Sequence, residues 1–142
     1  MKSFHIQEAS FRLPPVWEDQ TINIFVYQQK EGRPQSLIVA RQKLDKDQTL
    51  AGFAETNLKD QADKLPRFQS LGRRTRSIGG LEAIEVRTSW VKDNIAIFQY
   101  QVFVLYVDTL IAFTMSAPVE ERADCEGTMS EMLTEIRFRK PE

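Results

Sequence analysis

The chain of 142 residues contains little of the residue types that most often build reactive sites. It has a single cysteine, Cys125, and a single histidine, His5. One cysteine excludes an internal disulfide framework and any multi-cysteine metal site, and one histidine removes most zinc and Ser-His-Asp arrangements. A glycine-rich phosphate loop and a Gly-x-Ser-x-Gly motif are also absent. We therefore expect no catalytic residues, no metal and no cofactor.

Long hydrophobic runs and an excess of one charge are missing as well. The longest apolar run, Val102–Val107, has six residues, whereas spanning a bilayer takes about 20. The N-terminal residues lack the apolar stretch of a secretory signal, so the sequence predicts a cytoplasmic protein without direct membrane insertion. A net charge of −1 argues against a nucleic-acid partner, because phosphate neutralisation needs a basic surface.

The remaining composition is that of an ordinary globular protein. Hydrophobic residues make up 42% and charged residues 27% of the chain, which is typical of a soluble domain. No linker, repeat or low-complexity stretch divides it. A single domain over residues 1–142 is expected.

Apolar alternation predicts six or seven strands, most of them joined as hairpins. Gly79-Gly80 is typical of a two-residue hairpin turn, and Pro14-Pro15 and Lys30–Pro34 also separate strands. In Phe4–Leu13 the alternation of apolar and polar residues is interrupted in the middle, which predicts a bend or bulge. The expected strands are Phe4–Leu13, Thr21–Tyr27, Ser36–Arg41, Gln69–Ile78, Leu81–Val91, Ile95–Val107 and Leu110–Ala117.

Two helices complete the predicted fold. Apolar residues recur at helical spacing through Thr49–Leu65, which Thr49 can cap and Pro66 ends. The second helix follows Pro118, begins among acidic residues that suit its dipole, and has a buried stripe of Met129, Met132, Leu133 and Ile136. The fold class is therefore α+β, with an antiparallel sheet of six or seven strands and two main helices.

The predicted sheet is unusual because both of its faces are apolar. An antiparallel sheet normally has one buried and one solvated face, yet in Ile95–Val107 Phe103 stands on one face and Phe98 on the other. Two helices, each about 10 Å wide, would fill one face of a six-stranded sheet about 28 Å across. With both helices on one face, the second face is open. The alternative is one helix on each face, with loops completing the cover.

The open face is the candidate site, because a contiguous exposed apolar patch usually marks an interface. Neutral amides and hydroxyls among aliphatic residues can bond the polar groups of an apolar partner without burying a charge. Transmembrane helices use the same chemistry between themselves. Phe25 and Trp17 are instead expected in the core. The candidate residues on the open face are Ile22, Ile24, Val26, Ser36, Ile38, Gln99, Gln101 and Phe103.

Other polar residues receive a structural interpretation. Cys125 and His5 lie far apart in the sequence, and a free cysteine in a helix is most simply a packed residue; a hydrolase built on this pair is kept as an alternative. Glu82 and Glu85 could pair for acid–base work, but acids are too numerous here for that to be informative. A solvated strand edge accounts for Arg73, Arg74 and Arg76.

Glu8–Pro14 followed by Trp17–Phe25 resembles the Eag family, the effector-associated chaperones of bacterial type VI secretion systems. The block Asp19–Phe25, with the sequence DQTINIF, is the most specific part. The resemblance covers nearly the whole chain, through Ser36–Arg41, Phe53 to Phe68, Gly80 with Ala83, Trp90, Gln101–Phe103 and Ala117-Pro118.

The resemblance implies a PsbP-like fold with a curved sheet, and a homodimer. Family members bind the N-terminal transmembrane segments of toxic effectors that also carry a PAAR domain, and shield them in the cytoplasm until the effector is loaded on the VgrG spike. Their helix-binding residues correspond here to Ile22, Ile24, Ser36 and Gln101. Asn57 stands where relatives can have a glutamine, and Ala40 where they can have a second serine.

The sequence therefore predicts a non-enzymatic chaperone that binds apolar helices. A small lipid- or metabolite-binding module that uses the same apolar sheet face is the main alternative. Native mass spectrometry separates the two, since a bound small molecule in the purified protein favours the second.

Overall fold

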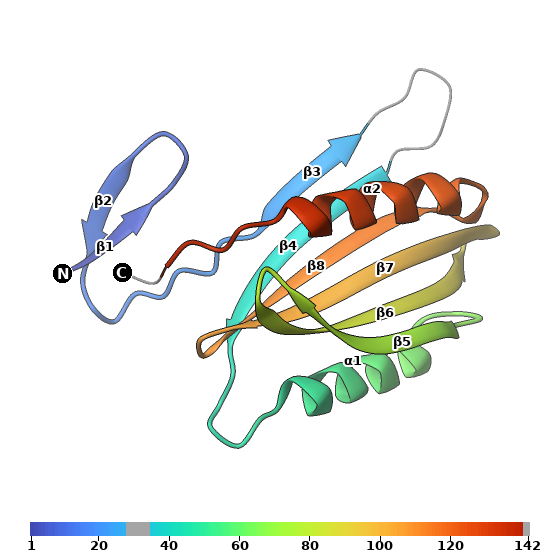
Figure 1. Ribbon diagram of the computed structural model, residues 1–142, viewed down its shortest axis with the longest axis horizontal. Helices are drawn as coiled ribbons and strands as arrows, with labels where there is room; N and C mark the ends of the chain where they lie inside the picture. The colour runs from blue at the N-terminus through green and yellow to red at the C-terminus, as the bar shows by residue number, and fades with distance from the viewer. Residues whose placement is uncertain (28–34, 141–142) are drawn as a thin grey trace.

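The computed structural model describes residues 1–27 and 35–140, and its main element is a six-stranded antiparallel sheet (Figure 1). The strand order is β3-β4-β8-β7-β6-β5, and two helices pack on the sheet. The α+β class is confirmed, whereas the turn expected at Lys30–Pro34 lies outside the described residues. The main-sheet strands are β3 (Asn23–Tyr27), β4 (Gln35–Lys43), β5 (Gln69–Ile78), β6 (Leu81–Lys92), β7 (Ile95–Tyr106) and β8 (Thr109–Pro118).

The N-terminal segment forms a separate hairpin. Strands β1 (Lys2–His5) and β2 (Ser10–Leu13) pair antiparallel in a two-stranded sheet, and the amide of Ile6 donates to the carbonyl of Ala9 at 2.9 Å. Figure 1 shows this hairpin beyond the end of the main sheet. The prediction of one bent strand over Phe4–Leu13 is therefore wrong: the break in parity marks a turn rather than a bulge.

Local sequence signals fix the other boundaries. Helix α1 (Leu50–Lys64) begins after Thr49, whose hydroxyl accepts from the amide of Gly52 at 3.0 Å. Helix α2 (Arg122–Glu135) follows a 3-10 turn at Val119–Glu121. Gly79 and Gly80 join β5 to β6 with φ angles of 56° and 83°, as a primed hairpin turn requires. In the part of the chain that the structure describes, no helix is both long and apolar enough to cross a bilayer.

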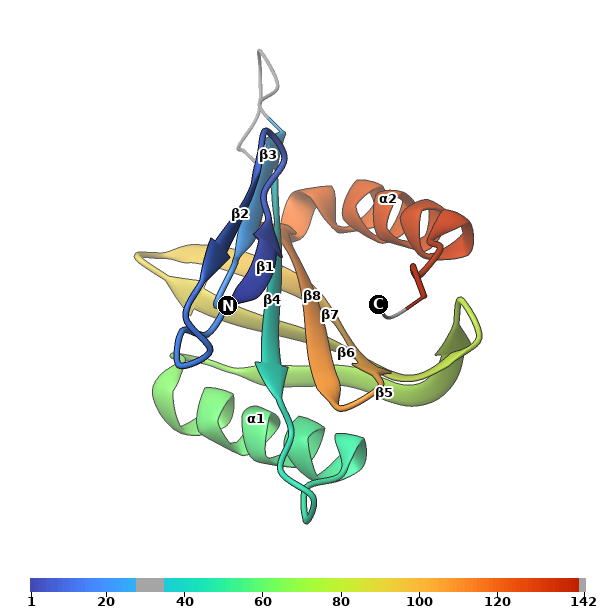
Figure 2. The same cartoon turned by 90° about the vertical axis from the view of Figure 1, so that its left-hand side faces the viewer.

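The two helices lie on opposite faces of the sheet (Figure 2). Helix α1 packs on Ile84 and Phe103, whereas α2 packs on the other face, against Phe98 and its neighbours. The interpretation with both helices on one face is thus wrong. Helix α1 packs over β6, β7 and the start of β8, where Leu110 is buried. The rest of this sheet face, at β3, β4 and the second half of β8, stays without a helix over it.

A buried ion cluster joins β5, β6 and β7 on the face that α2 covers. The carboxylate of Glu85 is fully buried and forms ion pairs with Arg74, with Arg76 at 2.9 Å and with Arg87 at 2.8 Å. The hydroxyl of Tyr100 donates to the same carboxylate at 2.7 Å. The interpretation of Arg74 and Arg76 as a merely solvated strand edge is therefore wrong. Side chains alternate along β5, so both arginines lie on the same face of the sheet as Glu85.

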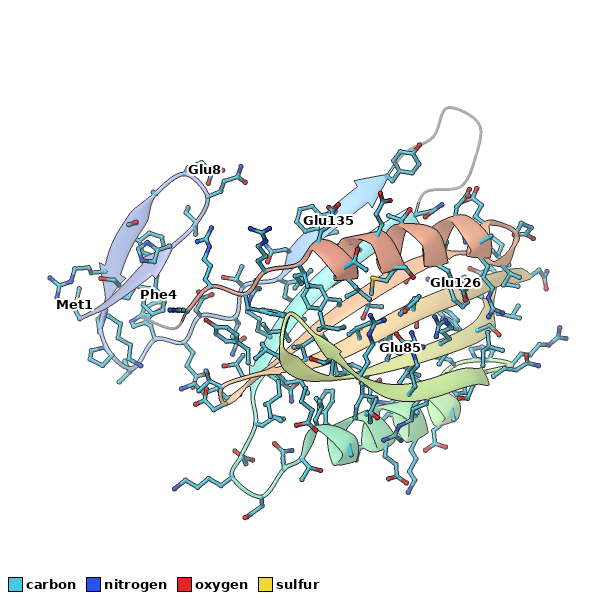
Figure 3. All side chains as sticks on the ribbon, viewed as in Figure 1. Met1, Phe4, Glu8, Glu85, Glu126 and Glu135 are labelled. Atoms are coloured by element: carbon cyan, nitrogen blue, oxygen red, sulfur yellow. The ribbon has the colours of Figure 1, made fainter. Side chains whose placement is uncertain are left out.

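These contacts set the ionisation of Glu85. Burial by itself raises its pKa, but the hydrogen bonds from the surrounding tyrosine and arginines outweigh burial and lower the pKa from 4.5 to about 2. Figure 3 shows Glu85 on the sheet close to Glu126 of α2. Arg87 bonds both carboxylates, at 2.8 and 3.2 Å, so the cluster also ties α2 to the sheet.

Acid should therefore destabilise the fold through Glu85. Because its folded pKa lies below the unfolded value, its contribution is present above about pH 4.5 and is lost as pH falls toward 2. The shift corresponds to about 3 kcal/mol at neutral pH. Glu85→Gln should be less stable than the parent at pH 7 and should lose less stability on acidification. Urea unfolding at pH 7, 4 and 2.5 measures both effects; equal acid sensitivity in the two proteins would contradict the assignment.

Candidate functional site

The uncovered part of the sheet brings together most of the residues expected on an open face. Residues opposite one another in antiparallel strands point to the same side, so the register sets side-chain rows across the sheet. One row runs Gln101, Thr114, Ile38, Ile24, and the next runs Gln99, Ser116, Ser36, Val26. We call this surface the open face: the residues of these two rows together with Ile22 and Ala40.

The β3 end of the open face is aliphatic and exposed. Ile22, Ile24 and Val26 are 57%, 63% and 55% exposed, and Ile38 beside them is 37% exposed. Strand β3 is the edge of the sheet, so its apolar side chains have no further strand beside them. A contiguous patch of exposed apolar side chains usually marks an interaction site.

The β7 end of the open face is polar but uncharged. The amide nitrogen of Gln101 donates to the hydroxyl of Thr114 at 3.3 Å, and that of Gln99 donates to Ser116 at 3.2 Å. Gln61 of α1 donates to the side-chain oxygens of both Gln101 and Asn57, at 2.9 and 2.7 Å. Gln101 is buried, with 7% of its surface exposed, whereas Gln99 is half-buried, so the exposed surface expected for Gln101 is not present in the free protein. The network holds both uncharged amides at the border between α1 and the open sheet, where they can offer hydrogen bonds to a ligand without burying a charge.

Two predicted site residues need separate mention. Phe103 is buried under α1, where its ring meets Phe53 edge-on at a centroid distance of 5.4 Å; its expected place on the exposed surface is wrong, because α1 occupies that part of the face. Asn57 lies on α1 itself and reaches the site through Gln61.

Sequence reasoning missed several residues at this surface. Gln61 is one of them: it is half-buried on α1, and its amide nitrogen joins Asn57 to Gln101. Trp17 is 56% exposed rather than in the core, and it lines a hollow of about 520 Å³ together with Phe4, Ile22 and Ala40. The alternation of side chains along β8 could have predicted that Thr114 and Ser116 lie on this face. No local signal in the sequence could have predicted that the N-terminal hairpin lies beside it.

The groups considered for nucleophilic chemistry do not form a site. Cys125 is fully buried in α2. Burial, and secondarily the charge of Glu126, raise the pKa of its thiol to about 11, so it is not present as a thiolate at neutral pH. His5 lies on the separate N-terminal hairpin and bonds Ser10 at 2.7 Å. Cys125 and His5 therefore do not act as nucleophile and base.

Comparison with known proteins agrees with this architecture. A curated protein of Pseudomonas aeruginosa strain PAO1, named "Effector EagT6", is 27% identical over 105 residues, which are 73% of each chain. The similarity to EagT6 confirms the resemblance to Eag proteins read from the sequence.

Solved structures show the same fold. A Pseudomonas aeruginosa protein, PA94, described as a putative regulator of unknown function, superposes with a TM-score of 0.87 at 22% identity over 99% of both chains. LpqN of Mycobacterium tuberculosis, described as involved in cell envelope biogenesis, gives 0.61 at 15% over 84% of both chains. PsbP of Synechocystis sp. PCC 6803 gives 0.53 at 11%, covering 87% of this chain and 94% of its own, so the PsbP-like fold is confirmed.

A family model assigns the chain directly. The model described as DcrB matches residues 8–135, which include the open face and both helices. The chain belongs to the DcrB family.

Proposed function

We propose that the protein is a cytoplasmic chaperone that binds the N-terminal transmembrane helices of a type VI secretion effector on its open face. The client also carries a PAAR domain, and the chaperone keeps it soluble until it is loaded on the VgrG spike. The similarity to EagT6 supports the link to an effector. The open face supports the part of the proposal that concerns apolar helices.

The observation that carries the proposal is the combination of exposed aliphatic side chains and neutral amides on one surface. A transmembrane helix in water exposes about 20 apolar residues, and covering that surface is favourable by about 25 cal/mol per Å². Ile24 and its neighbours replace the lipid, while Gln99 and Gln101 offer bonding partners to small polar side chains in the helix. Because the contacts are noncovalent, the client can be released without a chemical step.

Exposed apolar residues outside the open face favour a homodimer. Val16 and Trp17, in the linker after the N-terminal hairpin, are 87% and 56% exposed. A two-fold dimer is the commonest way for identical chains to cover such surface, and a second copy would also enclose more of a client helix.

Client binding should depend on the apolar segments of the effector. Co-expression with this chain should keep an effector fragment that contains its apolar N-terminal segments in the soluble fraction and allow its capture by affinity pull-down. A fragment without those segments should not be captured, because it lacks the surface that the open face covers. Capture that survives the deletion would mean that the client surface is a different one.

Ile24→Asp should abolish client binding and leave the domain folded. Ile24 is mostly solvent-exposed in the free protein, so an aspartate there remains hydrated. In the complex the carboxylate would be buried against hydrocarbon, at a cost on the order of several kcal/mol. Ile22→Asp should act in the same way. Pull-down and thermal melting of each variant test the two parts of the prediction.

Phe98→Asp is the control that shows what an aspartate in the core does to folding. Phe98 is fully buried, so this variant should lose its cooperative melt. Phe25 does not serve as this control, because it is 58% exposed and its expected place in the core is wrong. Should Ile24→Asp unfold the domain as Phe98→Asp does, the open face would be part of the core.

The oligomeric state has its own test. Multi-angle light scattering of the purified protein at micromolar concentration should give twice the mass of the 142-residue chain. Replacing Trp17 by Ser should shift the population toward monomer, because it removes an exposed apolar side chain without touching the main sheet. A monomeric parent protein would contradict the proposed dimer. It would not contradict the proposal that one open face binds one helix.

A further inference from the structure

A groove of about 770 Å³ lies on the face of the sheet opposite to the open face, between the β3 edge and α2. Its sheet side is formed by Phe25, Tyr27, Leu37 and Met115. Figure 2 shows α2 standing over this side of the sheet, away from α1. The groove shares Val26 and Ser36 with the open face at the β3 edge, but its walls, α2 and the aromatic side of β3, lie on the other side of the sheet.

The groove has apolar walls that are open to a ligand. Phe25 and Tyr27 are 58% and 59% exposed, and both point away from Ile24 and Val26 on the same strand. On the opposite wall, α2 presents Gly127, where an added Cβ would meet nothing within 4 Å. Aromatic side chains facing a wall without bulk leave room for the side chains of a partner segment.

The charges of the groove select the partner. Asp124 and Glu131 stand seven residues apart on α2, which is two helical turns, and both are exposed at the groove. The described residues that line it include no basic side chain. These carboxylates would repel a nucleic acid or an anionic lipid surface. A second copy seated by two-fold symmetry would bring its own α2 acids toward them, so a basic and apolar segment fits best.

Strand β3 connects this groove to the open face. Because β3 is the edge of the sheet, a chain can pass from one face to the other around it. The thickness of a packed sheet layer is about 10 Å, and about four extended residues span that distance. Transmembrane segments carry lysine, arginine and aromatic residues at their ends, which match the acids and the aromatic wall of the groove.

We propose that the groove binds the lysine- or arginine-bearing flank of the same client whose apolar helix lies on the open face. The inference rests on the proposed function and adds a second contact surface to it. The open face binds the hydrocarbon part of the segment, and Asp124 and Glu131 bind the basic part. The pair of surfaces then distinguishes a membrane segment with basic ends from other apolar sequences, and fixes which way the helix lies.

Two synthetic peptides test the proposal. Both contain the same 20-residue Leu–Ala helix with a fluorophore at one end; the other end carries three lysines in one peptide and three serines in the other. Binding is measured by fluorescence anisotropy at a fixed, low concentration of dodecyl maltoside. The parent protein should bind the lysine peptide about tenfold more tightly than the serine peptide at 50 mM salt, and the difference should shrink at 500 mM salt.

Charge reversal locates the effect. Asp124→Lys combined with Glu131→Lys should remove the preference for lysine while leaving the affinity for the serine peptide unchanged. The matched control reverses two exposed acids of α1, Glu55→Lys with Asp60→Lys, which changes the net charge equally and should keep the preference. Thermal melts of both double variants check that they are folded.

The outcomes separate this proposal from the proposed function. Equal binding of the two peptides by the parent, or the same loss of preference in both double variants, would overturn the role of the groove. Ile24→Asp should abolish binding of both peptides; if it leaves them unchanged, the open face is not the helix site and the proposed function fails instead. If Ile24→Asp abolishes binding of both peptides but charge reversal at Asp124 and Glu131 has no effect, the proposed chaperone function stands and the proposed role of the groove is wrong.

Discussion

The exposed surfaces of this molecule depend on a mismatch of widths between one helix and the sheet face that it covers. Six strands at about 4.8 Å each make a sheet far wider than a helix of about 10 Å. Helix α1 packs over β6 and β7, so the strands at the other end of that face have no cover. The opposite face receives α2, which packs on Phe98 and Met115. The open face and the groove beside α2 both result from this arrangement.

A sheet left partly bare needs its strands held in place by other contacts. The buried carboxylate of Glu85 supplies one such contact, because three arginines and a tyrosine from β5, β6 and β7 bond to it. Removing a single partner from a buried charge cluster is costly, since the remaining charges lose their compensation. Arg87 extends the cluster to Glu126 and so to α2. The β5–β7 half of the sheet is thus joined by ion pairs, whereas the exposed β3 end is apolar and neutral.

The neutrality of the open face fits reversible binding of a hydrocarbon-like ligand. A charge at this place would have to be desolvated on binding, whereas an amide exchanges one hydrogen-bond partner for another at a small net cost. Gln61, Gln101 and Thr114 already form such a chain of exchangeable bonds. The acids on α2 lie on the other side of β3, where they remain in water. The two faces therefore differ in chemistry: one is apolar and uncharged, and the other has carboxylates beside aromatic rings.

The sequence by itself determined the α+β class, both helices, the strands from Gln69 onward and the apolar rows of β3 and β4. These features follow from local periodicity, from the Thr49 cap and from the Gly79-Gly80 turn, which act over a few residues. The family resemblance, read from the block Asp19–Phe25, pointed to the same surface.

Only the tertiary structure decided which part of each face the helices cover. Periodicity identifies the buried stripe of a helix but not the strands against which it packs, because that choice depends on contacts between residues far apart in the chain. For this reason Phe103 lies under α1, Phe25 is exposed beside α2, and Arg74 and Arg76 meet at Glu85. The same physical reason explains Gln61: its place in the helical stripe is local, but its bond to Gln101 exists only once α1 lies on β7.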